Sequence, residues 1–297
     1  MIDLRDKPFL DHEDVVGLNF VKPSGKYFFR RHFRQGLRSH VMEMLRLDDL
    51  RKESKGVVID GVRWFPKATP VRIFRLFRTR LDSLDSALQE IERVKFVEDF
   101  LAPEGLAKST EFVVDYDGPD GCDILLCGLQ EYVPGEIIDP WTLLNRETMV
   151  AQLYATLRPL STVSEADRRQ WIDRTREKAA WFIGRIKRMI KETGHVPDLA
   201  GVGNIIMTQT GDIKLVDINN IAKVSFEAAV HLDDKGYPVC DKSIEALAML
   251  EEKLLGKVVD SAEPIYRFFL STERMEMTRA LTSQFHTVVE THVHKKY

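Results

Sequence analysis

The most constraining part of the chain is one stretch of its second half, residues 197–220, where oxygen-bearing side chains alternate with glycines and apolar strands. Asp198 and Asn204 flank a glycine-containing loop, and Asp217 follows an alternating apolar run. A loop and a hairpin turning near Gly211 would bring these three side chains together. Mg²⁺ prefers oxygen ligands and is usually held by one or two side chains plus substrate phosphates. The stretch therefore predicts a place where a metal ion and a phosphate meet.

Each of these residues also has an ordinary structural role. Asp198 can cap a helix or a turn, Asn204 is a common turn residue, and Asp217 can accept backbone N–H bonds where a strand ends. Their order on one loop and one hairpin favours the metal site over three unrelated structural roles.

Length and composition limit the other possibilities. With 297 residues the chain is expected to form two lobes or domains. Its 44% hydrophobic and 30% charged residues are typical of globular proteins, and no apolar run approaches the roughly 20 residues that span a bilayer. The first residues lack the pattern of a secretory signal, and the three cysteines, Cys122, Cys127 and Cys240, lack metal-ligand spacing. We expect reduced thiols and a cytoplasmic protein.

The net charge of −3 hides a strongly basic segment. Residues 22–80 contain 16 Lys or Arg and five acidic residues, with aromatic side chains interleaved at 26–34. Such a segment attracts phosphates, whether of a nucleotide, a lipid head group or nucleic acid. The alternative is a solvated face whose aromatic side chains pack inward. A position at the inner face of a membrane therefore stays open beside the cytoplasmic one.

Periodicity and turn residues give the expected elements. In chain order they are a helical patch at 37–50, a hairpin at 56–65 around Asp60-Gly61, a strand at 71–77, a helix at 84–101, strands at 111–116 and 123–129, a helix at 174–193 ending at Gly194, a hairpin at 204–218 and a helix at 242–255. This order predicts an α+β fold of two lobes. Residues 1–55 are expected to form a basic extension, 56–131 a small β-rich lobe with one helix, and 132–297 a larger, mainly helical lobe.

These elements and motifs resemble the protein-kinase-like superfamily, in its atypical branches of small-molecule, antibiotic and lipopolysaccharide-core kinases. The resemblance covers about residues 56–255. It implies that Asp198 is the catalytic-loop aspartate that faces an acceptor hydroxyl, and that Asn204 and Asp217 bind the metal. It also implies that ATP and Mg²⁺ are the cofactors, with the nucleotide lying between the lobes.

The same resemblance implies nucleotide contacts elsewhere in the chain. The segment Gln130–Glu136 looks like the hinge of antibiotic and sugar kinases, where the backbone around Glu131 and Val133 would bind adenine. The family's strand lysine has no counterpart, and Arg75 is assigned its phosphate role, with Glu90 of the following helix as its partner. Arg binds phosphate in bidentate fashion but is not interchangeable with Lys.

Three departures from the family pattern leave a second reading open. No glycine-rich phosphate loop is evident, Val196-Pro197-Asp198 stands where His-Arg-Asp would be, and Asp217-Ile218-Asn219 stands where Asp-Phe-Gly would be. The favoured expectation is an ATP- and magnesium-dependent phosphotransferase acting on a hydroxyl acceptor, with a phosphorylated or lipid-linked sugar preferred over a protein. The alternative is a pseudokinase that binds nucleotide or serves as an interaction module. A binder of nucleic acid or of an anionic membrane is the least favoured reading.

Overall fold

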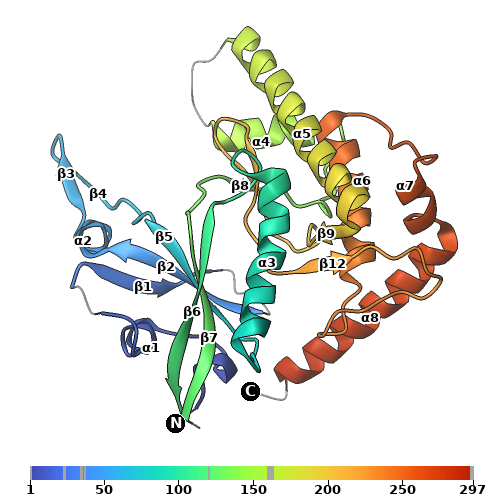
Figure 1. Ribbon diagram of the computed structural model, residues 1–297. Helices are drawn as coiled ribbons and strands as arrows, with labels where there is room; N and C mark the ends of the chain where they lie inside the picture. The colour runs from blue at the N-terminus through green and yellow to red at the C-terminus, as the bar shows by residue number, and fades with distance from the viewer. Residues whose placement is uncertain are drawn as a thin grey trace. The chain divides into compact units, whose positions relative to one another are not determined.

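The computed structural model describes residues 2–22, 25–33, 36, 38–119, 121–158 and 164–294 (Figure 1). The chain divides into two units, one formed by Met1–Lys95 and Ala107–Tyr132 and the other by Phe96–Leu106 and Val133–Tyr297. The first unit is built on a β-sheet, and the second is mainly helical. The structure is therefore mixed α and β, as expected, and each unit is described by itself.

A five-stranded antiparallel sheet organises the first unit, in the order β1-β2-β5-β7-β6. Its strands are β1 (Tyr27–Arg31), β2 (Ser39–Arg46), β5 (Arg72–Phe77), β6 (Ser109–Gly118) and β7 (Gly121–Gln130). The strands expected at 71–77, 111–116 and 123–129 are confirmed. Strand β5 lies between β2 and β7, and all but its first residue are buried, because both of its edges and both of its faces are covered.

Side chains from β5 contribute to two apolar clusters on opposite faces of the sheet, as alternation along a strand requires. Phe74 and Leu76 pack with Leu10 and Val15, which come from the N-terminal residues and from helix α1 (His12–Val16). Phe77 packs with Ala87 of helix α3 (Leu84–Leu101), whose bounds are those expected from its apolar stripe.

The expectation of an extension at residues 1–55 is wrong. Residues in this range form β1 and β2 of the sheet, together with α1 and with helix α2 (Leu47–Lys55). The helical patch expected at 37–50 is strand over Ser39–Arg46 and helix only from Leu47, and Leu37 lies outside the described residues. Pairing with β1 on one side and β5 on the other outweighs the local helical periodicity, which is a weak determinant by comparison.

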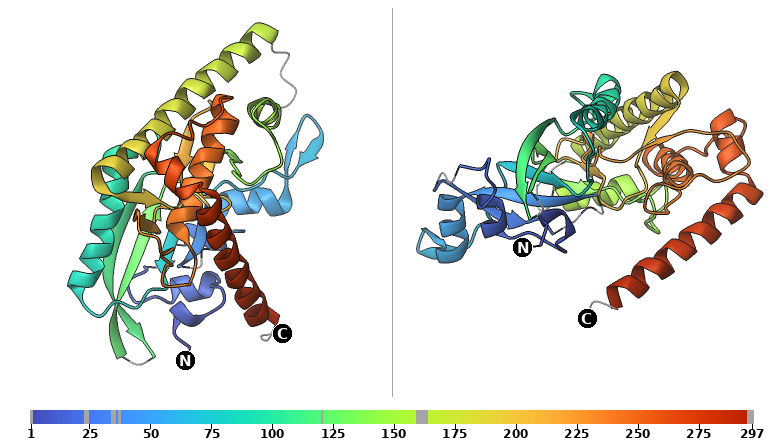
Figure 2. Two further views of the ribbon diagram at one scale, coloured as in Figure 1. Left: turned by 90° about the vertical axis from the view of Figure 1, so that its right-hand side faces the viewer. Right: turned by 60° about the horizontal axis from the view of Figure 1, so that its bottom comes forward.

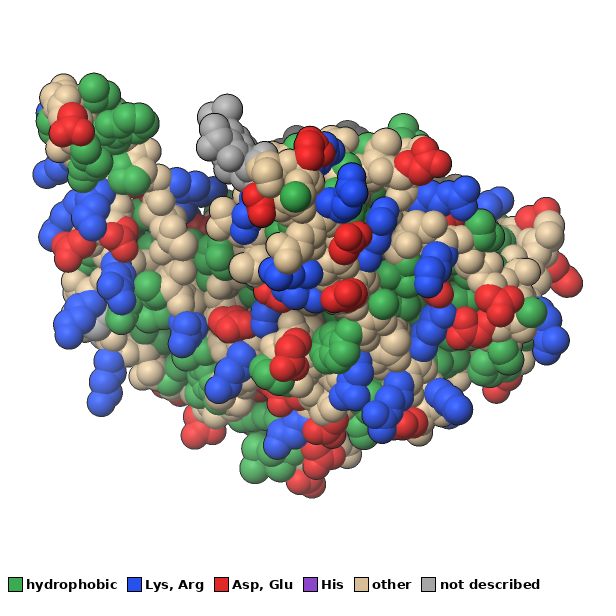
Figure 3. All heavy atoms as spheres, turned by 90° about the horizontal axis from the view of Figure 1, so that it is seen from above, with side chains coloured by type: hydrophobic (Ala, Val, Ile, Leu, Met, Phe, Trp, Pro, Cys, Tyr) green, Lys and Arg blue, Asp and Glu red, His purple; other side chains and the backbone are tan. Residues whose placement is uncertain are grey.

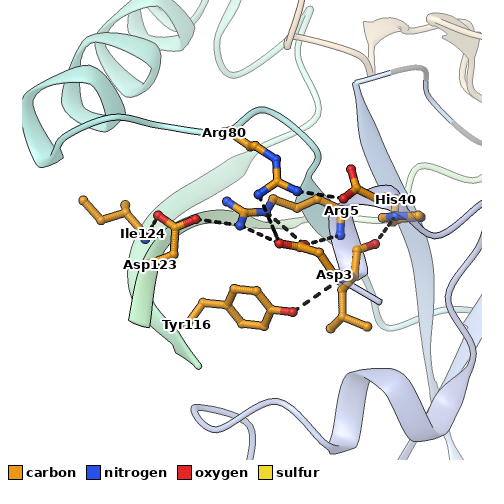
Figure 4. A network of polar contacts seen from close by, with 9 residues as sticks. Asp3, Arg5, His40, Arg80, Tyr116, Asp123 and Ile124 are labelled. Carbon is orange, nitrogen blue, oxygen red and sulfur yellow. Dashed lines mark hydrogen bonds and ion pairs between the residues drawn. The ribbon is translucent and has the colours of Figure 1, made fainter. Parts of the chain in front are cut away.

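The first residues are held to the sheet by a network of polar contacts (Figure 4). The buried Arg5 guanidinium donates to the carboxylate of Asp3 at 2.7 Å and to that of Asp123 in β7 at 2.6 Å. The short 3-10 helix η1 (Leu4–Asp6) contributes a backbone contact, because the Leu4 carbonyl lies 2.9 Å from Nε2 of the buried His40 in β2. The N-terminal segment is thus an integral part of the first unit.

One hairpin of the first unit is separate from the five-stranded sheet. It consists of β3 (Val57–Ile59) and β4 (Val62–Trp64) and follows α2 directly. Asp60 and Gly61 form its turn with φ of 49° and 78°, the positive values that two-residue hairpin turns require. The expectation of a hairpin at 56–65 is confirmed.

The second unit is formed mostly by helices (Figure 2). They are α4 (Met149–Leu157), α5 (Glu165–Thr193), α6 (Val239–Leu255), α7 (Pro264–Phe269) and α8 (Thr272–His294). Helix α5 begins nine residues earlier than expected, at a Ser164 cap, and ends as expected at Gly194 with φ of 68°. Helix α6 is the most deeply buried of these elements, with ten buried residues on several of its sides. No described helix is both long enough and apolar enough to cross a membrane.

Two small sheets of the second unit carry the candidate site. One has the order β11-β10-β8 and the other pairs β12 with β9. Their strands are β8 (Glu136–Ile137), β9 (His195–Pro197), β10 (Ile205–Met207), β11 (Ile213–Leu215) and β12 (Ile221–Lys223). The hairpin expected at 204–218 is confirmed as β10 and β11.

Candidate metal and phosphate site

Two antiparallel pairings bring the three predicted residues of the second unit together. The backbone N–H of Asp198, directly after β9, donates to the carbonyl of Asn220 beside β12 at 2.8 Å. The N–H of Val216, directly after β11, donates to the carbonyl of Asn204 before β10 at 2.7 Å. The β9–β12 strand pair and the β10–β11 strand pair therefore both end at the segment that carries Asp217.

Asp198 is held by its own loop. Its Oδ1 accepts hydrogen bonds from the N–H groups of Ala200 at 3.0 Å and Gly201 at 3.1 Å, and its carboxylate also accepts one from the Asn220 side chain. Burial, followed by the negative charge of Asp217, raises the pKa of Asp198 to about 6. A carboxylate with such a pKa is suited to accept a proton near neutral pH.

Asn204 closes the loop that begins at Asp198. Its Nδ2 donates to the carbonyl oxygen of Asp198 at 2.9 Å, which fixes the side chain and turns Oδ1 away from that carbonyl. A Cβ at Gly201 would lie 2.5 Å from this Nδ2, so only glycine permits the loop to close in this way. The buried amide is therefore oriented by the same bond that shapes the loop.

Asp217 is oriented by the residues that follow it. Its Oδ1 accepts the backbone N–H of Asn219 at 3.2 Å, and the intervening Ile218 is buried in the apolar interior. The charge of Asp217 contributes to the raised pKa of Asp198, which shows that the two carboxylates are near neighbours. Two nearby carboxylates favour a cation at this position.

Asn219 is a site residue that the sequence reasoning missed. Its Nδ2 and its Oδ1 are both buried, and neither has a hydrogen-bond partner among the described residues. A buried amide without partners costs free energy, so such a group usually marks a ligand, ion or water position. The available signal in the sequence is the amide itself, because Asn219 occupies the place of glycine in the Asp-Phe-Gly pattern.

The loop rests on helix α6 and on one tryptophan. The hydroxyl of Ser243 in α6 accepts the N–H of Leu199 at 3.2 Å, and Nε1 of Trp141 donates to the carbonyl of Ala200 at 2.8 Å. The ammonium of Lys242 lies 3.9 Å from the centre of the Trp141 ring. These contacts hold the backbone on both sides of Asp198's loop in place.

The first unit contains the residues assigned to nucleotide phosphates. Arg75 lies in the middle of β5, paired with Val41 and Gly128, and is buried rather than on a solvated edge strand. Its side chain points to the face of the sheet that packs against α3, since Phe77 does so two residues later. Glu90 pairs with Arg93, three residues along the same helix, at 2.8 Å, and its predicted pairing with Arg75 stays a prediction.

The predicted adenine contacts follow β7. The N–H of Glu131 donates to the carbonyl of Lys108 at 2.8 Å. Val133 is buried, and neither its N–H nor its carbonyl forms a backbone hydrogen bond with another described residue. The adenine contacts assigned to Glu131 and Val133 stay a prediction.

The donor set of the second unit fits a hard divalent cation that is also bound by phosphate. Among the described residues no group of three or more His, Cys, Asp and Glu side chains is placed to hold a metal by itself. The available ligands are two carboxylates and two amides, which suits Mg²⁺ with phosphate oxygens completing its octahedron better than it suits zinc.

Comparison with known proteins gives little guidance. No family model matches the chain, and no curated protein matches it. Among solved structures, the chain is similar to the ROP18 kinase domain in complex with AMP-PNP and sucrose, with 9% sequence identity over 88% of this chain and 82% of that one and a TM-score of 0.34. A likeness with so low a TM-score supports no assignment.

Proposed function

We propose that the protein is an atypical kinase-like phosphotransferase that uses ATP and Mg²⁺ to phosphorylate a hydroxyl group. The main support is the cluster of Asp198, Asn204 and Asp217, in which one carboxylate has a raised pKa and the adjacent Asn219 amide is buried without a hydrogen-bond partner in the described part of the chain. Two carboxylates beside an unsatisfied amide are an unfavourable arrangement unless a cation and an anion occupy the site together. Magnesium bound to a triphosphate supplies both.

Each residue has a role that follows from its position. Asp217 and Asn204 would hold the metal, which supplies charge neutralisation of the phosphates when bound. Asp198 would orient the acceptor hydroxyl and take its proton as the oxygen bonds to the γ-phosphorus, while the bond from that phosphorus to ADP breaks. Arg75 is proposed as a phosphate ligand, and the backbone of Glu131 and Val133 as the adenine contact.

The acceptor class is inferred from charge. The basic segment at 22–80 contains 16 Lys or Arg against five acidic residues, although the chain as a whole carries −3. The positive electrostatic potential of such a segment attracts anionic substrates. We therefore propose a phosphorylated or lipid-linked sugar as the acceptor.

A pseudokinase is the second candidate. The family's strand lysine is replaced by Arg75, and its His-Arg-Asp motif by Val196-Pro197-Asp198. A protein of this kind would bind nucleotide at the same residues without transferring the phosphoryl group.

Thermal unfolding with ATP, in the presence and absence of Mg²⁺, tests the binding part of the proposal. The wild type should be stabilised by ATP only when Mg²⁺ is present, since a ligand that binds the folded state raises its stability. Asp217→Asn should lose this magnesium dependence. Asp173→Asn removes an exposed carboxylate of α5 and serves as the matched control. Equal stabilisation of Asp217→Asn and wild type would refute the metal assignment.

Turnover separates the enzyme from the pseudokinase. With a panel of phosphorylated and lipid-linked sugars, Asp198→Asn should lower ADP release by roughly 10²- to 10⁴-fold, the usual contribution of a general base. Its stabilisation by Mg·ATP should persist. Nucleotide binding by the wild type without turnover on any acceptor would favour the pseudokinase.

A further inference from the structure

The β3–β4 hairpin exposes an unusually large number of apolar side chains for an isolated two-stranded ribbon. Five large apolar side chains are each between 54% and 62% exposed: Val58, Ile59, Val62, Trp64 and Phe65. The hairpin stands away from the five-stranded sheet in Figure 1 and in the left view of Figure 2. Isolated hairpins are marginally stable in water, so apolar residues left exposed on one indicate a partner surface.

The strand register gives this ribbon one wholly apolar face. Ile59 pairs with Val62 and Val57 pairs with Trp64, and side chains directly opposite one another share a face. The other face carries Val58 and its partner Arg63. The ribbon thus has one apolar face with an aromatic residue at its base.

The hairpin is held in a defined shape. A Cβ at Gly56, whose φ is 73°, would lie 2.9 Å from the Trp64 carbonyl and 2.8 Å from Arg63 Cγ. The Arg63 guanidinium donates to the Lys55 carbonyl at the end of α2, at 2.8 Å. The base of the hairpin is therefore fixed to the helix that precedes it.

Positive charge surrounds the apolar ribbon. Lys55 and Lys67 are exposed at its base, Arg63 is exposed on its other face, and none of the three has an acidic partner among the described residues. The acids of α2 already have partners, Asp48 and Asp49 in Arg51 and Lys52 of the same helix, and Glu53 in Arg30 of β1. Figure 3 shows the resulting surface, a projecting knob of hydrophobic atoms at the upper left with Lys and Arg side chains beside it.

We propose that the β3–β4 hairpin docks on an anionic phospholipid membrane, with its apolar face in the interface and its basic residues on the head groups. Aromatic and aliphatic side chains at an interface, flanked by Lys and Arg, are the combination that binds peripheral proteins to anionic lipid. Asp60 at the turn opposes this attraction. Asp60 lies at the far end of the ribbon from Lys55 and Lys67. We therefore expect the apolar face, rather than the tip, to contact the lipid.

Co-sedimentation with vesicles, without ATP or Mg²⁺, tests this proposal independently of the proposed function. The protein should sediment with phosphatidylcholine–phosphatidylglycerol vesicles and about tenfold less with phosphatidylcholine alone, and added salt should release it. Ile59→Ser/Trp64→Ser should lower binding by about tenfold or more, since it removes exposed apolar area from the docking face. Lys55→Ala/Lys67→Ala should do the same, because each cation near the surface contributes about fivefold.

Two controls make the result specific. Val258→Ser removes another highly exposed apolar side chain outside the hairpin and should leave vesicle binding unchanged. Asp60→Asn keeps a residue that favours this turn and should strengthen binding to anionic vesicles.

Both hairpin variants should keep the wild-type melting temperature, since the replaced side chains are exposed. Failure to sediment with anionic vesicles, or equal sedimentation of the hairpin variants, would overturn the proposal. A wild-type dimer that becomes monomeric in Ile59→Ser/Trp64→Ser would overturn it as well, in favour of a second copy as the occupant.

Discussion

The side-chain amide of Asn204 donates to the main-chain carbonyl of Asp198 at 2.9 Å. The residue that shapes the loop of the proposed base is thus also the proposed metal ligand. The proposed function therefore couples loop structure to metal binding through a single amide, and this coupling can be measured.

Asn204→Asp should uncouple the two functions of that amide. The carboxylate cannot donate to the Asp198 carbonyl, and it adds a negative charge near Asp198 and Asp217. We expect the free energy of unfolding to fall by about 1–3 kcal/mol without metal. Added Mg²⁺ should restore stability to the variant more than to the wild type, which paired thermal melts with and without Mg²⁺ would show. An identical magnesium effect in both proteins would argue against a cation at this site.

Gly201→Ala should disrupt the loop, because the new Cβ would lie 2.5 Å from the Asn204 amide nitrogen. We expect a loss of about 1–3 kcal/mol, as for other overpacked positions, together with weaker stabilisation by Mg·ATP. Gly184→Ala is the matched control, since no atom lies within 4 Å of a Cβ at that position in α5. It should stabilise the protein by about 0.5–1 kcal/mol through helix propensity. Chemical denaturation should show that the free energy of unfolding falls in Gly201→Ala and rises in Gly184→Ala.

Arg274→Met should be among the most destabilising single changes in the second unit. Arg274 of α8 and Asp241 of α6 form a buried ion pair, with Nη2 donating to Oδ2 at 3.1 Å, and Nη1 donates to the carbonyls of Glu227 and Ala228. Removing the cation leaves a buried carboxylate without its partner, which typically costs about 3–5 kcal/mol. In a double-mutant cycle by urea unfolding, Asp241→Asn combined with Arg274→Met should cost less than the sum of the single changes. Simple additivity would show that the pair is not coupled.

His40 should make the first unit sensitive to acid. Burial, followed by the charge of Arg78, lowers the pKa of this imidazole from 6.5 to about 4. The neutral ring donates from Nε2 to the Leu4 carbonyl and faces Arg78 with Nδ1. Between pH 6.5 and 4 the unfolded chain takes up a proton that the folded chain excludes. The free energy of unfolding should therefore fall as the pH drops through this window, by about 3 kcal/mol in total.

Urea denaturation at several pH values measures this effect. His40→Gln should be less stable than the wild type near neutral pH but should lose less stability between pH 6.5 and 4. His231→Gln, at an exposed histidine, should follow the wild-type curve. Parallel curves for His40→Gln and wild type would contradict the buried neutral histidine.

Elements whose signal is local were predictable from sequence. The apolar stripe of α3, the Asp60-Gly61 turn and the Gly194 helix end each depend on neighbouring residues alone, so their bounds or positions agree with the structure. The hairpin of β10 and β11 was predictable for the same reason, and with it the proximity of Asn204 to the segment of Asp217.

Features that depend on distant residues were not predictable from sequence. Residues 39–46 have a helical pattern and form a strand because β1 and β5 supply partners on both edges. Glu90 pairs with Arg93 of the same helix, a contact that its position beside the apolar stripe did not predict.

The sequence alone determined which oxygen-bearing residues can form the site, because their spacing along one loop and one hairpin is a local property. Only the tertiary structure decided that Asp198 is half-buried and feels the charge of Asp217, that the Asn219 amide has no partner among the described residues, and that the β3–β4 hairpin keeps its apolar side chains exposed. Burial and the proximity of charges depend on contacts between segments far apart in the chain, and no local pattern of residues specifies them.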